Sequence, residues 1–295
     1  MATIDAEALA RRARCLYAMY LRGCAERKLT QRGHGFLPTC GGSAQDWLSL
    51  CDKAVRDPAL VGSFSEAERS LMKIKGGKMR VFQGRYCVYC AHSLDMLAQA
   101  LGAQEREVDS VELSYIASTL TPEAVLGNDP PAWLASPQLI SLGELHRLES
   151  ITSAYAWRLR LHVLTLTVVF RESPHPFTPD KEKEEFVARV IAEGAERCAE
   201  VGLFLPIRGD FPMGKYTFGE YISRKMVTAS NVEAMTSQRV RAVRWMMDGQ
   251  GDWDLTRGAT PQEFTIPEHL RGSSYPSCLE WMFDPDVDTD SFRYM

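Results

Sequence analysis

The sequence predicts a mainly α-helical protein, with a single multi-helix globular domain, long loops and an irregular C-terminal tail. Apolar residues recur at helical spacing, for example at Leu9, Ala13 and Leu16. Capping boxes precede several such segments, and clusters of glycine and proline separate them. With 295 residues, 45% of them hydrophobic, the chain is large enough to bury a sizeable core. We expect a helical domain over residues 1–257 and an acidic tail packed on it over residues 258–295.

The first hundred residues are expected to form four helices. The first covers Ala6–Lys28, with Arg11 and Arg22 opposite its apolar face. Ser43 caps a short helix through Val55, and a Ser65–Glu68 capping box opens another that runs to Ile74. A central helix over Lys78–Leu101 is apolar on more than one side, which predicts that it is buried.

The middle of the chain is harder to interpret. Prolines exclude long helices from residues 104–140, so short helices and loops are expected there. A long helix is predicted over Ser141–Arg171. Its part from 162 to 170 is rich in threonine and valine, so a strand stays open as an alternative. Prolines over residues 173–179 mark a loop and a candidate sub-boundary.

The last helices begin at recognisable start signals. Thr178 and Pro179 predict a helix that ends at Gly202. A proline- and glycine-rich loop follows, and a Thr217–Glu220 capping box then predicts two helices, one to about Ala229 and one over Asn231–Met247.

Charge argues against some classes of partner. The 34 basic and 38 acidic residues are well mixed and leave a net charge of -4, whereas a nucleic-acid binder usually concentrates basic charge. The longest apolar stretch, Leu159–Phe170, is interrupted by polar residues and is too short to span a bilayer. The first ten residues lack a secretory pattern. We therefore expect a cytoplasmic protein without nucleic-acid or membrane partners.

No residue pattern points to catalysis or to a cofactor. Cys87 and Cys90 form the chain's one Cys-x-x-Cys pair, with His92 close by, which resembles half of a zinc site. The second ligand pair is missing and the segment lies in an apolar helical pattern, so buried thiols are the stronger interpretation. No Gly-x-Ser-x-Gly sequence is present, and Gly76-Gly77-Lys78 lacks the other residues of a phosphate loop. We predict no catalytic residue, no cofactor and no metal.

Carboxylates gather in two places where a basic partner would be attracted. One is the start of the helix after Pro179, with Glu182, Glu184 and Glu185. A solvated first turn, favoured by the helix dipole, is the stronger interpretation of this group. The other is in the tail, where aromatic side chains accompany the acids. The candidate residues there are Trp281, Phe283, Asp284, Asp286 and Asp288.

The segment Gln238–Met246, followed by Asp252-Trp253-Asp254, resembles the signature of the bacterial domain-of-unknown-function family 4272. Residues Ser65–Leu71 and Arg85–Gly102 are similar to two other segments of that family. This chain departs from the pattern at three polar positions, where Gln238, Arg244 and Ala259 replace the usual Glu, Asn and Asp. The resemblance implies a fold class and carries no established activity.

The same signature contains residues that we expect to stabilise the fold. Arg239 shares a helix face with apolar residues, and a buried arginine needs a carboxylate partner. Asp252 or Asp254, just beyond the helix, is the predicted partner, and with Trp245 and Trp253 they would form a structural clasp. Trp253 flanked by two aspartates also suits a basic binding surface, so both interpretations stay open.

Together these features favour a non-catalytic protein-binding module. The specific hypothesis is an immunity protein that neutralises a basic toxin delivered between bacteria, for instance a nuclease-like type VI effector, since carboxylates complement a basic active site. The alternative is an enzyme whose site is assembled from dispersed residues such as Arg239, Asp252 and His162.

Overall fold

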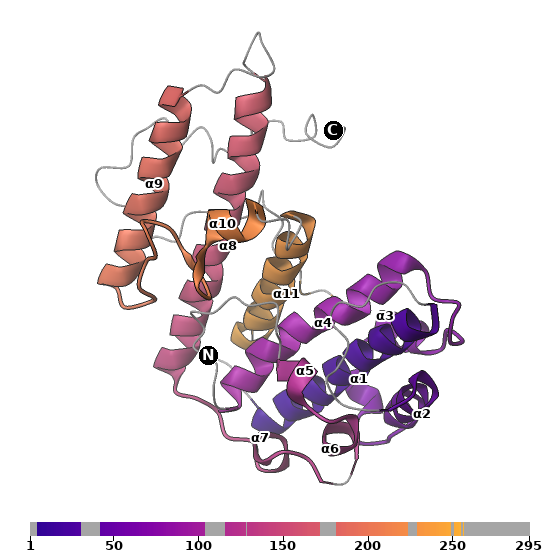
Figure 1. The fold of residues 1–295 in the computed structure, drawn as a ribbon. Coiled ribbons are helices and arrows are strands. Elements are labelled where there is room, and N and C mark those ends of the chain that lie inside the picture. Colours follow the sequence, from indigo (N-terminus) through magenta and orange to yellow (C-terminus); the bar gives the residue numbers. More distant parts are fainter. Residues whose placement is uncertain are drawn as a thin grey trace. The chain divides into compact units, whose positions relative to one another are not determined.

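A computed structural model of the chain describes residues 5–30, 42–103, 116–127, 129–171, 181–223, 229–248, 251–254 and 256 (Figure 1). These residues are mostly helical, as predicted. The helices are α1 (Ala6–Thr30), α2 (Ala44–Ala54), α3 (Glu66–Met72), α4 (Val81–Ala100), α5 (Ile116–Thr119), α6 (Pro122–Leu126), α7 (Ala132–Ala135), α8 (Leu142–Arg171), α9 (Lys181–Glu200), α10 (Phe218–Ser223) and α11 (Ala229–Met247). A 3-10 turn, η1 (Val61–Ser63), and two short strands, β1 (Pro212–Met213) and β2 (Tyr216–Thr217), complete the described elements.

The chain divides into two compact units that interleave along the sequence. The first unit draws on the described residues of Met1–Glu105, Leu113–Leu145 and Gln238–Gly258, and the second on those of His146–Ser237. Both α8 and α11 contribute residues to both units. The first unit is therefore discontinuous in the sequence, and the described part of the second unit lies between two of its segments. The expected boundary near 173–179 and the tail from 258 lie outside the described residues.

In the first unit, α1 packs along α4 at its centre, and α2, α3 and α6 lie against α1 (Figure 1). The two central helices approach closely at Gly23. A Cβ atom there would lie 2.9 Å from the backbone oxygen of Gly84 and 2.9 Å from the Cβ of Cys87. Small residues on both helices are what this approach requires. Most of α1 is consequently buried, including Leu16, Tyr17 and Met19.

The helix starts predicted at Ser43 and Ser65 are confirmed by their hydrogen bonds, whereas the start predicted at Thr178 lies outside the described residues. Ser43 and Asp46 form a capping box at α2, and Ser65 and Glu68 form one at α3. Glu68 has a second role, because it also accepts hydrogen bonds of 2.7 and 2.5 Å from the buried Arg12 of α1. The cap of α3 and a buried ion pair thus share one carboxylate.

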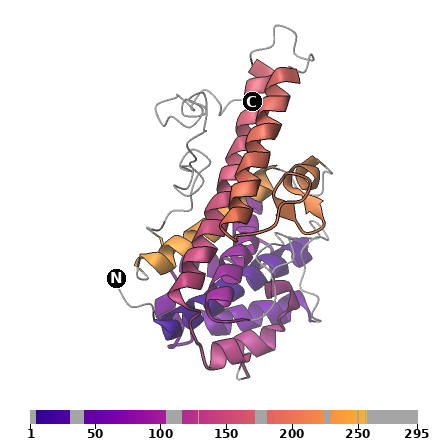
Figure 2. The same cartoon turned by 90° about the vertical axis from the view of Figure 1, so that its left-hand side faces the viewer.

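The second unit is built around α8 and α9, which run side by side in both views (Figures 1 and 2). Trp157 of α8 is buried against Gly194 of α9, where a Cβ atom would lie only 2.3 Å from the indole. Arg158 pairs with Asp210 at 2.7 and 3.0 Å, and Asp210 also accepts from the backbone N–H of Gly219 in α10. These contacts fix the loop after α9 onto α8.

The remaining predictions have mixed outcomes. The backbone is helical through residues 162–170, so the strand alternative is wrong. Short helices do occupy the proline-rich middle region, and Gly202 ends α9 with a positive φ of 72°. The loop expected over 203–216 contains a small antiparallel pairing instead, in which Met213 faces Tyr216 around Gly214. Its strands are too short to show an alternating pattern in the sequence.

Candidate partner-binding surface

The signature residues form a buried clasp in the first unit. The indole of Trp253 is buried, with the guanidinium of Arg12 stacked 3.9 Å from its centroid and that of Arg241 at 4.8 Å. Trp245 meets Trp253 edge-on at 5.4 Å and donates a hydrogen bond to the oxygen of Gly251. The turn after α11 is thereby held against α1, as expected of a structural clasp.

The predicted partner of Arg239 is wrong. Arg239 pairs with Asp95 of α4 at 3.6 Å, while Arg241 approaches Asp254 at 3.9 Å and donates to the backbone oxygen of Trp253 at 2.7 Å. Two residues along a helix correspond to a rotation of about 200°, so Arg239 and Arg241 point to different neighbours. Asp95 was not a candidate, because it lies some 145 residues earlier in the chain, within an otherwise apolar helix.

Asp252 and Asp254 mainly shape the turn. The side chain of Asp252 accepts a hydrogen bond of 2.8 Å from the backbone N–H of Asp254, and its backbone oxygen accepts one from Thr256. His162, the third residue of the dispersed-site alternative, lies in the second unit against Phe218. Burial, followed by Arg158, lowers the pKa of His162. Each of these residues therefore has a contact within its own unit.

Cys87, Cys90 and His92 are all buried in α4. Burial raises the pKa of Cys90 to about 12 and holds the pKa of His92 well below its ordinary value. Thiols of this kind stay protonated and unreactive near neutral pH. Among the described residues, no three His, Cys, Asp or Glu side chains are grouped so that they could hold a metal ion. Within that part of the chain, the cysteine pair behaves as core.

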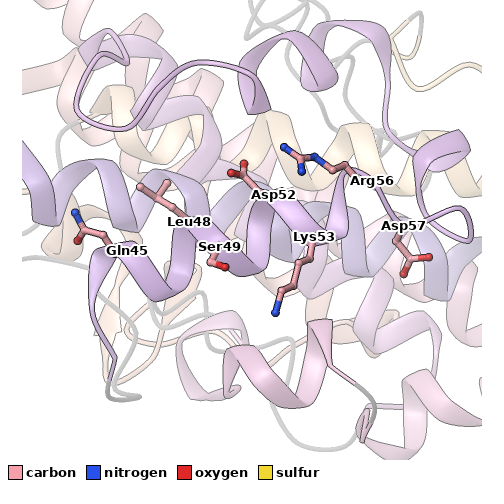
Figure 3. A pocket seen from close by; sticks show the side chains of 7 residues that line it. All are labelled: Gln45, Leu48, Ser49, Asp52, Lys53, Arg56 and Asp57. Atoms are coloured by element: carbon pink, nitrogen blue, oxygen red, sulfur yellow. The ribbon is translucent and has the colours of Figure 1, made fainter.

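A hollow of about 650 Å³ lies along α2 (Figure 3). Most of its side chains are solvent-exposed, and its lining carries two acidic and two basic side chains. The lining residues are Gln45, Leu48, Ser49, Asp52, Lys53, Arg56 and Asp57. Only Leu48 is apolar, so the hollow lacks the enclosed apolar lining of a typical small-molecule site. We do not assign a ligand to it.

The solvent-exposed face of α9 is strongly acidic. Its exposed charged residues are Glu185, Arg189, Glu193, Glu196 and Glu200. At 100° per residue these five lie within an arc of about 80°, along roughly 22 Å of helix. The opposite face is buried and includes Val190, Ala195 and Cys198. We call this row of side chains the α9 acidic face.

Two exposed apolar side chains follow the acidic face directly. Val201 is 51% exposed and Leu205 is 79% exposed. Leu203 and Phe204, between them, are buried, and Arg147 of α8 donates hydrogen bonds to the backbone oxygens of Gly202 and Leu203. Leu205 is thus held outward by a loop that its neighbours fix in place.

The structure bears on only part of the sequence-based contact surface. Glu185 is exposed on the α9 acidic face, while the side chains of Glu182 and Glu184 lie outside those described. All five tail candidates, from Trp281 to Asp288, also lie outside the described residues. Sequence reasoning missed Glu193, Glu196 and Glu200, although their spacing with Glu185 follows the helical period.

The chain matches no family model, no curated protein and no solved structure. The resemblance to domain-of-unknown-function family 4272 therefore rests on the quoted segments alone. None of the described helices has both the length and the apolar character needed to cross a bilayer.

Proposed function

We propose that this chain is a non-catalytic protein-binding module whose α9 acidic face contacts a basic protein. The observation that carries the proposal is the combination of four aligned carboxylates with an exposed leucine on a fixed loop. Opposite charges across an interface accelerate association, and an apolar side chain at the contact supplies buried area. A basic surface with an apolar pocket next to it is the partner that this arrangement suits.

The geometry of the loop supports the role of Leu205 as an anchor. Binding is weakened when side chains and loops must be ordered on contact, so a preorganised residue binds more tightly. Arg189 is the one cation among the five exposed charged residues of the α9 acidic face, so the face keeps a net negative charge. The exposed Arg208 of the following loop is paired with Glu220 at 2.5 Å. Leu205 follows the last carboxylate of the acidic row, Glu200, by five residues, and both belong to the second unit.

The specific proposal is an immunity protein that neutralises a basic toxin, such as a nuclease delivered between bacteria. A nuclease active site is basic because it holds phosphates, so a carboxylate-rich inhibitor is attracted to it. The tail around Trp281, Phe283 and Asp284 has the same composition and is the second expected contact. The expected partner is therefore a protein with a basic surface.

Co-expression with the product of the neighbouring gene tests the proposal. Wild-type protein should restore growth to cells that produce the toxin. Reversing Glu193 and Glu196 to lysine should abolish protection, because two attractions become two repulsions. The matched control reverses Glu7 and Asp248, two exposed acids of the first unit, and should protect like wild type. Equal protection by both variants would overturn the assignment to α9.

A further inference from the structure

A second charged surface, of opposite sign, lies in the first unit where α3 connects to α4 (Figure 1). The thirteen residues from Lys73 to Arg85 contain no aspartate or glutamate. All five of their basic side chains are exposed, and none forms an ion pair with another described residue. The five are Lys73, Lys75, Lys78, Arg80 and Arg85. We call this segment the basic edge.

Two adjacent apolar side chains project from the middle of the basic edge. Val81 is 48% exposed and Phe82 is 63% exposed, at the first turn of α4. Exposed aliphatic and aromatic neighbours surrounded by cations are unfavourable in water, because the apolar area has nothing to cover it. The next residues inward, such as Gly84 and Val88, are buried, so exposure is confined to this turn.

Buried polar groups of α1 hold the backbone of the basic edge in place. Glu26 accepts a hydrogen bond of 2.6 Å from the N–H of Gly77, and Arg22 donates to the backbone oxygens of Met72 and Ile74. Gly77 adopts a positive φ of 78°, which makes the turn tight. The segment therefore presents its cations and apolar pair from a fixed backbone.

From this arrangement we propose that the basic edge binds the surface of an anionic phospholipid bilayer, with Val81 and Phe82 entering the interface. Clustered lysine and arginine side chains are attracted to acidic headgroups, and apolar side chains gain from the acyl boundary below them. Such binding is peripheral and needs no spanning helix. It concerns the first unit and is independent of the proposed contact at α9.

The apolar pair distinguishes a bilayer from a nucleic acid. An anionic bilayer and a nucleic acid would both attract the five cations. Of the two apolar side chains, only Phe82 is able to stack on a base. Val81 has no aromatic face, so it gains from a hydrocarbon environment and not from base stacking. Long lysine side chains also tolerate the irregular spacing of fluid headgroups, whereas specific recognition of bases uses fixed bidentate contacts.

Co-sedimentation of the full chain with vesicles tests this proposal. The probe is phosphatidylcholine containing about one-third phosphatidylglycerol, with pure phosphatidylcholine as the reference. Wild-type protein should bind the anionic vesicles only, and added salt should release it. Each cation lost from the edge should weaken partitioning by about fivefold, so Lys75→Glu with Lys78→Glu should weaken it at least 25-fold. Phe82→Ser should weaken it by about tenfold.

A matched control reverses Lys53 and Arg56, two exposed cations of α2, and should change partitioning much less than the edge variant. Circular dichroism should be the same for all variants, since every substituted side chain is exposed. Two results would overturn the proposal. One is that wild-type protein does not bind anionic vesicles. This includes the outcome in which it binds a single-stranded RNA oligonucleotide through the same cations. The other is vesicle binding that Phe82→Ser leaves unchanged.

Discussion

Replacing Trp253 by alanine should destabilise the first unit far more than any other change in its turn. The indole is 5% exposed and lies between Arg12, Arg241 and the edge of Trp245. Truncation of a buried tryptophan typically costs about 3–5 kcal/mol, since the lost transfer free energy is joined by the cavity left behind. Such a loss is a large part of the free energy of unfolding of an ordinary domain.

Urea denaturation followed by far-ultraviolet circular dichroism measures this loss. Asp254→Asn is the matched variant, because the Asp254 carboxylate is partly exposed and lies 3.9 Å from Arg241. A partly exposed pair of this kind contributes below about 1 kcal/mol, so that variant should unfold almost like wild type. Should Trp253→Ala lower the free energy of unfolding by less than about 1 kcal/mol, the turn does not pack on α1 and the clasp is refuted.

Two further predictions concern packing and pH. Gly194→Ala should destabilise the protein by about 1–3 kcal/mol and so lower its melting temperature, because the added Cβ would meet the buried Trp157 at 2.3 Å. The control Gly143→Ala, at the exposed start of α8, should leave the melting temperature unchanged. Equal melting temperatures for the two variants would argue against the contact between α8 and α9. His92 should reduce stability in acid. The pKa of His92 in the folded protein is held well below the ordinary 6.5, chiefly by burial and then by Arg239. Below pH 6.5 the unfolded chain therefore binds a proton that the folded protein does not, and the free energy of unfolding falls by about 1.4 kcal/mol per pH unit. Above pH 6.5 this loss is absent. Between pH 6.5 and 5, thermal unfolding of His92→Leu should depend less steeply on pH than that of wild type, and identical slopes would count against a neutral buried His92.

Local patterns predicted the helices well because helix starts depend on near neighbours. The capping boxes at Ser43, Ser65 and Thr217 all form, since each needs only a side chain three residues away. The interleaving of two units was not predicted. It depends on which distant segments share a core, and the helical period by itself does not specify this.

Local sequence patterns likewise do not specify which buried charges pair when the partners are far apart in the chain. The sequence correctly indicated that Arg239 would need a carboxylate, but proximity along the chain selected Asp252 or Asp254 over Asp95. The basic edge was visible in the sequence as thirteen residues without an acid. It was overlooked because net charge averages over the whole chain, whereas a partner meets one surface.

The affinity of the purified toxin for charge-reversed protein tests the central claim most directly. Wild type and Glu193→Lys/Glu196→Lys would be compared by stopped-flow association and by calorimetry at low and moderate salt. The account predicts that charge reversal slows association by at least tenfold at low salt, that salt reduces the difference, and that Leu205→Ala accelerates dissociation instead. Unchanged association and dissociation in both variants would contradict the claim that α9 and its following loop bind a basic partner.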